Sequence, residues 1–236
     1  MNLLTLVNKF CQRSGISTTN SVYGTTDDRI LQVMGLLEEE VNDLASRHTW
    51  QGLQREAVHT TIANEDQGDI NTLDSGFRFL RNNTIWDTTD RLPVLGPLDG
   101  QQWQALKAIL STGPRYQFRF RGDHLLVNPV PVAGHVWKWE YESKYAILDV
   151  NGTTTKEFFT ADTDTFLIPD NLALLGLRWR WAAQKGLDYG ELFNTYERQV
   201  KDAMGRDGGK TCLFMDDESI GISPGIFAPV GNWLVP

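Results

Sequence analysis

The sequence is poor in the residues that build disulfide frameworks and metal centres. Its 236 residues include only two cysteines, Cys11 and Cys212, and four histidines. The cysteines lie near opposite ends of the chain and form no CxxC motif, which is typical of a protein from a reducing compartment. The histidines have none of the spacings that zinc ligation requires. We therefore expect no metal ion and no cofactor.

The sequence also lacks long hydrophobic runs and an excess of basic over acidic residues. No apolar stretch approaches the ~20 residues that cross a bilayer, and polar residues interrupt the first 15 positions too often for a signal peptide. These two absences predict a soluble protein that is made in the cytoplasm and enters no membrane. The formal net charge of −8 argues against a protein that coats nucleic acid, because binding to phosphates needs a basic face.

No motif in the sequence assigns a reaction. The segment GRDGGKT at 205–211 ends like a phosphate-binding loop, but Met204 stands where the first glycine of that motif belongs. The segment also follows a predicted helix instead of joining a strand to one. Asp162 and Asp164, and the acidic loop at 66–71, are better explained as turn formers than as calcium ligands. We therefore expect that the protein is not an enzyme.

Helical periodicity is present near the N-terminus. Residues 2–13 predict a first helix, which Gly15 stops. A second helix is expected to run to about His48 from a cap at Thr25 or Thr26. Its apolar stripe is the strongest periodic signal in the chain and consists of Ile30, Val33, Met34, Leu37, Val41 and Leu44. The middle of this stripe is expected to be buried between helices from both ends of the chain.

The central region has the shorter periodicity of β-strands, from about residue 50 to 166. Residues 116–128 predict a hairpin, and residues 135–145 alternate tryptophan and tyrosine with other side chains. Two further strands are expected to meet at an Asn82-Asn83 turn, and 99–110 predicts a short helix. These elements predict an antiparallel sheet folded into a sandwich or an open barrel.

Four basic residues lie on predicted strands of this region, namely Arg115, Arg119, Arg121 and Lys138. A solvated sheet face explains such a group most simply. Two alternatives remain open, because these side chains would also suit the wall of a DNA channel or contact with an acidic neighbour.

Two more helices follow the strands. One opens at Pro169 and ends at Gly186, and the other runs from Asp188 to about Met204. The order of elements predicts an α+β fold in which an antiparallel β domain is inserted into a helical bundle. The bundle comprises residues 1–50 and 169–205, the β domain comprises 51–168, and an extended tail comprises 206–236.

Long ordered segments of the chain are similar to a known family. The segments TTDDRILQVMGLLEEEVNDLASRHTW and FTADTDTFLIPDNLALLGLRWRWAAQKGLDYGELFNTYERQV resemble head-to-tail adaptor (connector) proteins of tailed bacteriophages. The strands between them resemble the same family, so the similarity covers roughly residues 27–203. The last residues, 211–236, match no part of the family pattern.

This resemblance implies a structural virion protein. Adaptors form a ring, commonly of twelve copies, between the portal protein and the tail nozzle or tube, with fibre proteins as further possible neighbours. Genomic DNA passes through the ring without tight binding, and the family implies no cofactor and no reaction. The protein would be assembled in the host cytoplasm and reside at the head-tail junction. The alternatives are another tail structural subunit (nozzle, tube or fibre attachment) and, less favoured, a virion-associated cell-wall hydrolase.

The tail is the predicted docking element for a partner protein. It is rich in apolar residues, yet glycines and prolines interrupt it too often for a helix or a long strand. Segments of this kind bind by laying side chains into grooves of a partner. The expected docking residues are Phe214, Ile226, Phe227, Trp233, Leu234 and Val235. The alternative is a strap that folds back over the sheet of its own chain.

Charged residues on two helices are the predicted subunit interface, namely Glu38, Glu39, Arg178 and Arg180. Successive helical residues point about 100° apart, so Trp179 and Arg180 cannot share a face. One of the two is expected to pack within the bundle and the other to reach a neighbouring subunit. The alternative is that Trp179 and Trp181 both pack in the core of their own chain.

Overall fold

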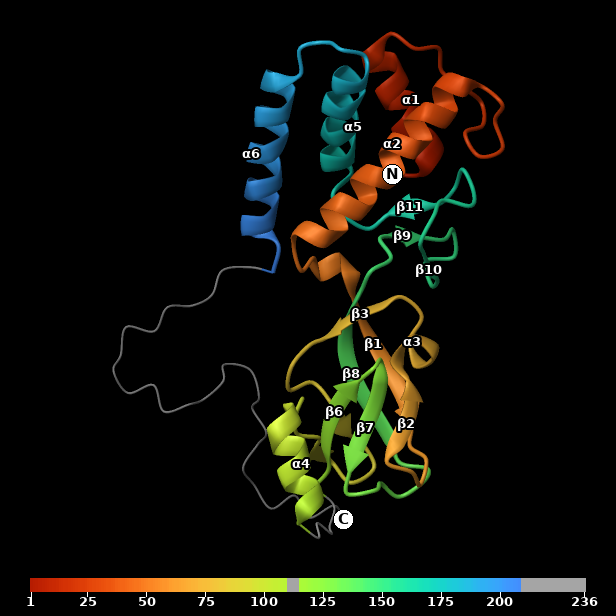
Figure 1. Cartoon of the computed structure of the whole chain (residues 1–236). Coiled ribbons are helices and arrows are strands. Elements are labelled where there is room, and N and C mark those ends of the chain that lie inside the picture. The colour runs from red at the N-terminus through yellow and green to blue at the C-terminus, as the bar shows by residue number, and fades with distance from the viewer. Residues whose placement is uncertain (110–114, 209–236) are drawn as a thin grey trace, which may run out of the picture.

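The computed structural model describes residues 1–109 and 115–208. Helices and antiparallel sheets are both present, so the predicted α+β class is confirmed. The chain is elongated, with the long helices α1, α2, α5 and α6 at one end and most strands at the other (Figure 1). We call these two parts the helical end and the two-sheet unit. No helix within the described residues combines the length and the hydrophobicity that crossing a membrane requires.

Helix α1 spans Leu3–Ser14, close to the predicted 2–13. Asn2 caps it, because the Asn2 side chain accepts a hydrogen bond from the backbone N–H of Thr5 at 3.0 Å. Gly15 ends the helix with a φ of 69°, a left-handed conformation that glycine adopts without steric cost. Both ends of α1 are therefore set by the residues that flank it in the sequence.

Helix α2 spans Asp28–Arg47. Its cap is Asp27, whose carboxylate accepts the N–H of Arg29 at 2.9 Å, so the predicted cap at Thr25 or Thr26 is wrong. A carboxylate in this position also benefits from the positive end of the helix dipole. The predicted stripe is buried except for Met34, which is only partly covered, and its buried members are Ile30, Val33, Leu37, Val41 and Leu44.

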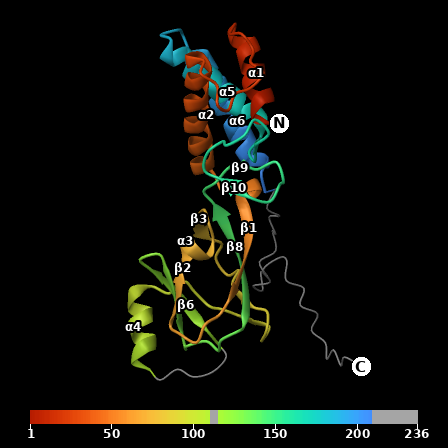
Figure 2. The same ribbon diagram turned by 90° about the vertical axis from the view of Figure 1, so that its right-hand side faces the viewer.

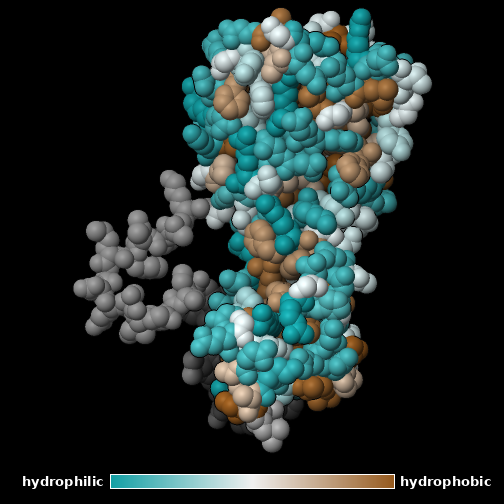
Figure 3. All heavy atoms as spheres, viewed as in Figure 1, coloured by the Kyte–Doolittle hydropathy of each residue, from teal (hydrophilic) through white to brown (hydrophobic). Residues whose placement is uncertain are grey.

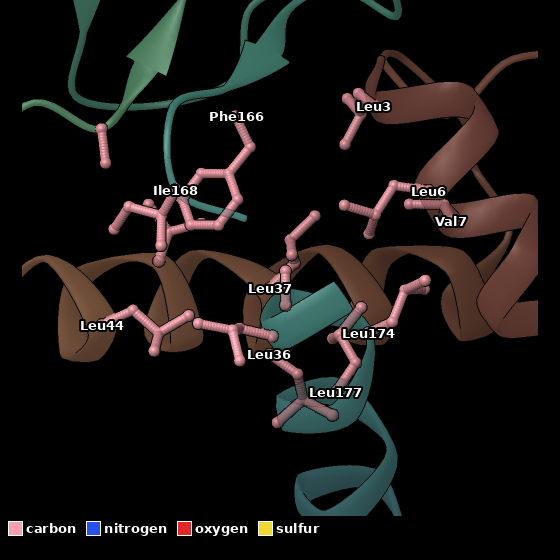
Figure 4. Close-up of a cluster of buried hydrophobic side chains, with 14 of the residues drawn as sticks. Leu3, Leu6, Val7, Leu36, Leu37, Leu44, Phe166, Ile168, Leu174 and Leu177 are labelled. Atoms are coloured by element: carbon pink, nitrogen blue, oxygen red, sulfur yellow. The ribbon is translucent and has the colours of Figure 1, made fainter. Parts of the chain in front are cut away.

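Helices α5 (Asp170–Gln184) and α6 (Gly190–Arg206) complete the helical end. Helix α5 packs against α1, α2 and α6, so it is the central helix of the group. The two views in Figures 1 and 2 show the four helices lying together. Leu37 of α2 lies close to Leu174 and Leu177 of α5 in their shared core (Figure 4).

The larger sheet of the two-sheet unit is antiparallel and has the strand order β1-β8-β4-β5, with β3 also paired to β8. Its strands are β1 (Gln54–Thr60), β3 (Phe77–Leu80), β4 (Trp86–Asp87), β5 (Leu92–Pro93) and β8 (Val136–Ser143). Strands β3 and β4 both pair with β8, one after the other. The prediction that they pair with each other across Asn82-Asn83 is therefore wrong, because β8 is long enough to receive both.

The smaller sheet has the order β2-β7-β6, with strands β2 (Asp66–Asp69), β6 (Gln117–Arg121) and β7 (His124–Asn128). Strands β6 and β7 form the predicted hairpin. Its turn residues Gly122 and Asp123 both have positive φ, at 58° and 64°, as the tightest hairpin turns require. The short helix α3 (Ile70–Leu73) follows β2, and α4 (Gly100–Ala108) precedes β6.

The two sheets share one hydrophobic core, separate from that of the helical end. The larger sheet contributes Trp137, Trp139 and Tyr141, which alternate with outward residues as expected. The smaller sheet contributes Phe118, Leu125 and Val127 from the facing side. Figure 2 shows the unit from the side, with β1 and β8 on one flank and β6 and α4 on the other.

A third, small sheet adjoins the helices and consists of β9 (Ile147–Leu148), β10 (Thr155–Lys156) and β11 (Thr165–Phe166). The loop before β11 contains the two aspartates considered above. Asp162 accepts the N–H groups of Val22 and Tyr23, at 2.9 and 2.7 Å. Asp164 is buried and accepts the N–H of Ala161 at 2.9 Å. Both carboxylates therefore hold loops in place, as turn formers do.

Replacing Leu37 by alanine tests the core of the helical end. Leu37 is fully buried, so the variant should lose about 2–5 kcal/mol of unfolding free energy. Leu31 lies on the same helix but is 49% exposed, and Leu31→Ala should change stability by less than about 0.5 kcal/mol. Urea denaturation of both variants measures the difference, and equal midpoints would contradict the assignment.

Asp74, between α3 and β3, makes the stability of the two-sheet unit depend on pH. Burial raises the pKa of the Asp74 carboxyl to about 6, and the indole of Trp139 opposes the shift only in part. The unfolded chain ionises this group near pH 4, so its contribution to stability is lost as pH rises from about 4 to 6. Asparagine does not titrate. Asp74→Asn should therefore match wild type at pH 4 and exceed it by roughly 1–2 kcal/mol above pH 6, measured by urea denaturation at both pH values.

Candidate functional site

Arg180 on α5 lies at the centre of a charged network between three helices. Its Nε donates to Glu40 at 2.7 Å and its Nη2 donates to Asp43 at 2.9 Å. Its Nη1 donates to Glu39. All three carboxylates belong to α2, and only 10% of the Arg180 side chain is exposed. The guanidinium therefore joins α5 to α2 within one chain.

The network continues from α2 to α6 through Arg47. Arg47 donates to Asp43 at 2.9 Å and to Glu197 of α6 at 2.5 Å. The Arg47 guanidinium also lies over the ring of Tyr196, 5.5 Å from its centroid. Four carboxylates thus share two guanidinium groups, and the shared contacts fix the positions of α2, α5 and α6 relative to one another.

Glu40 is the buried member of the network. Its side chain is fully covered, and its carboxylate lies against the backbone of α5 at Gly176. A Cβ at Gly176 would overlap this carboxylate, so only glycine leaves room for it. Burial raises the pKa of Glu40, while the Arg180 guanidinium and the Tyr196 hydroxyl oppose the shift. Burial, together with the negative charge of the neighbouring Glu40, raises the pKa of the Tyr196 hydroxyl.

A buried ion pair of this kind positions helices more than it stabilises them. Removing two charges from water costs nearly as much as their attraction returns, but losing one partner leaves a buried charge and costs about 3–5 kcal/mol. The hydrogen bond between the Arg180 guanidinium and the Glu40 carboxylate is therefore a requirement of this packing of α5 against α2. Because the carboxylates and guanidinium groups bind each other, the network holds α2, α5 and α6 in one arrangement.

The aromatic residues of α5 pack inside the chain. Trp179 contacts Phe193 and Tyr196 of α6, with ring centroids 5.2 and 6.0 Å apart. Trp181 contacts Phe10 of α1 at 5.8 Å. The structure thus favours the alternative in which both tryptophans lie in the core of their own chain. Arg180 is also placed differently from the expectation that it reaches a neighbouring subunit, because α2 supplies its partners.

The other predicted interface residues remain at the surface. Glu39 is largely exposed apart from its contact with Arg180, with 62% of its side chain accessible. Glu38 and Arg178 are half-buried, and neither forms an ion pair with a described residue. Their predicted role between subunits stays a prediction. The predicted docking residues lie outside the described residues: Phe214, Ile226, Phe227, Trp233, Leu234 and Val235.

A second group of titratable side chains, which the sequence did not point to, lies at the end of β4. His135 Nδ1 is 2.8 Å from Asp87 Oδ2 and 3.6 Å from Asp90 Oδ2. The other oxygen of Asp87 accepts the N–H groups of Thr89 and Asp90, at 2.9 and 3.1 Å. The buried Asp87 carboxylate thus already has donors on both oxygens. These contacts explain the group as the anchor of a turn.

Gly176→Ala tests whether Glu40 determines the packing of α5. Alanine is otherwise the better helix former by about 1 kcal/mol, but here its Cβ displaces the Glu40 carboxylate from Arg180. The variant should lose roughly 2 kcal/mol or more of unfolding free energy. The control is Gly35→Ala on α2, where no atom lies within 4 Å of the new Cβ, and it should leave stability equal or higher. Equal effects of the two substitutions in thermal melts would contradict this account.

Comparison with known proteins assigns no family to this site. The chain matches no protein-family model, and a search of curated proteins finds no match. The function of the chain is therefore argued from its residues and their geometry.

Proposed function

We propose that the chain is a structural virion protein, a head-to-tail adaptor that forms a ring between portal and tail. The proposal depends mainly on residues 159–200, the segment whose sequence resembles adaptor proteins most specifically. This segment contains Trp179, Arg180, Tyr196 and Glu197, the side chains that join α5 and α6 to each other and to α2. The similarity to adaptors therefore falls on residues that determine the architecture of the helical end.

The shape of the chain is consistent with this role. We interpret the helical end as a bundle of residues 1–50 and 169–205, and the two-sheet unit with its small neighbouring sheet as an inserted β domain of residues 51–168. An elongated subunit with distinct ends suits a ring that contacts one partner above and another below. Hydrophilic residues cover most of the visible face of the helical end, whereas hydrophobic residues gather at the narrow middle and at the far end of the two-sheet unit (Figure 3).

The proposed partners follow from this placement. The portal protein binds on one side of the ring, and the tail nozzle or tube, with fibre proteins, binds on the other. Residues 206–236 supply docking contacts. The ring has twelve copies and continues the DNA channel, and a net charge of −8 suits a lumen through which DNA slides without being gripped. A nozzle, tube or fibre-attachment subunit is the second candidate, since it would use the same rigid helices and surfaces.

Assembly on the portal separates these candidates. The purified chain should be monomeric by native mass spectrometry and should form a ring of about twelve copies when mixed with the portal ring of its virus. A nozzle subunit would instead bind only after an adaptor is in place. A monomer that ignores the portal and hydrolyses purified peptidoglycan would contradict the proposal.

A further inference from the structure

The outer face of the larger sheet carries acidic residues beside an exposed tryptophan. Residues that alternate with the core point outward here, among them Glu56, Lys138, Glu140 and Trp86. Trp86 is 37% exposed, and all four residues line a shallow groove of about 360 Å³. This face is therefore accessible along its length in the single chain.

The charges on this face are not balanced within the chain. Glu56 and Glu140 stand directly opposite each other on β1 and β8, an arrangement of like charges that disfavours pairing of the strands. Lys138 binds Glu56 at 2.9 Å. Glu140 forms no ion pair with any residue that the structure describes. Its carboxylate is thus available to a cation from outside the chain.

The outer face of the smaller sheet carries unpaired cations. Phe118 and Phe120 of β6 point into the core, so Arg119 and Arg121 point away from it. Neither arginine forms an ion pair within residues 1–109 and 115–208, although the Asp66 carboxylate, which pairs with His124 opposite Arg121, is close enough to interact with the charge of Arg121. Arg121 is exposed, whereas Arg119 is half-buried beside the start of α4. The two faces therefore have opposite unpaired charges and look in opposite directions (Figure 2).

The charged residues of the two faces also lie at similar levels along the strand direction. In the core between the sheets, the ring of Phe77 contacts both Tyr141 of β8 and Phe120 of β6, with centroids 5.7 and 5.9 Å apart. Glu140 is the neighbour of Tyr141, and Arg121 is the neighbour of Phe120. Tyr116 of β6 also contacts Trp137 of β8, with centroids 5.5 Å apart, so β6 and β8 run in the same direction. Glu140 is therefore level with Arg119, and Arg121 lies two residues, about 6–7 Å, further along the strand direction on the opposite side of the unit. This offset is within the reach of a long guanidinium side chain.

We propose that Glu140 of one copy binds Arg121 of the next copy around the ring. This inference rests on the proposed ring, in which each subunit contacts its two neighbours through two different faces at similar height. A guanidinium is the fitting cation, because it pairs with a carboxylate and stacks on the face of an indole, here that of Trp86. Arg119 comes two residues before Arg121 on β6, level with Glu140, and extends the same basic face. The occupant of the groove is thus a second copy of this chain.

Charge reversal tests the pairing in the full-length protein. Glu140→Arg and Arg121→Glu should each raise the concentration needed for ring assembly on the portal about tenfold or more. An equimolar mixture of the two variants should assemble like wild type, because an alternating ring contains only matched pairs. The double variant should assemble like wild type by itself. Mass photometry measures ring formation, and thermal melts of the monomers check that each variant is folded.

The control reverses exposed charges away from both faces. Glu157→Arg and Lys201→Glu change charge by the same amounts on exposed sites and should assemble like wild type. If the variants at Glu140 and Arg121 also assemble like wild type, the pairing is wrong while the proposed ring stands. The pairing is equally wrong if both fail alone and the mixture does not restore assembly. A wild-type chain that forms no ring, even with the portal, overturns the proposed function and the pairing together.

Discussion

The burial of Glu40 between α2 and α5 is the constraint on which the helical end depends. A fully covered carboxylate needs a cation and a space, and α5 supplies both: Arg180 as the cation and Gly176 as the space. The two residues are four positions apart, so they lie on the same face of the helix, one turn from each other. Sliding α5 by one turn would leave Glu40 without a partner and would also place a side chain against it. The network thus admits one register of these helices.

The two-sheet unit is attached to the helical end through polar contacts at the narrow middle. Arg78 of β3 donates to the carbonyl of Ala45 at the end of α2, at 2.7 Å, and to the buried carboxylate of Glu142 on β8, at 3.0 Å. On the other side, Asp207 at the end of α6 accepts the N–H of Gln51 at 2.8 Å. Arg78 thus links β3 and β8 to the end of α2, while Asp207 ties the end of α6 to the short helical turn that precedes β1.

The periodic spacing of apolar residues among polar ones predicted much of the fold. The helical stripe containing Leu37 and the alternation around Trp137 each identify a buried face, because burial repeats with the period of the element. The hairpin after β6 was predictable from Gly122-Asp123. The pairing of β3 and β4 with β8 was not, because short strands of similar composition can pair with each other or with a third strand. Glu40 was also missed, because it stands in a run of three glutamates that looks like a solvated face.

The α+β class, the ends of α1 and the buried faces of the elements could be predicted from the sequence by itself, since these depend on neighbouring residues and on periodicity. The sequence also predicted that Trp179 and Arg180 leave α5 in directions about 100° apart, although the Arg180 guanidinium lies over the Trp179 ring, 4.6 Å from its centroid. The tertiary structure alone decided what each face meets: Trp179 meets α6, and Arg180 meets the carboxylates of α2. The reason is that local geometry sets the direction of a side chain relative to its own helix, whereas its partners come from other segments. For Arg180 those partners are about 140 residues away in the sequence, and for Trp179 they lie on the next helix.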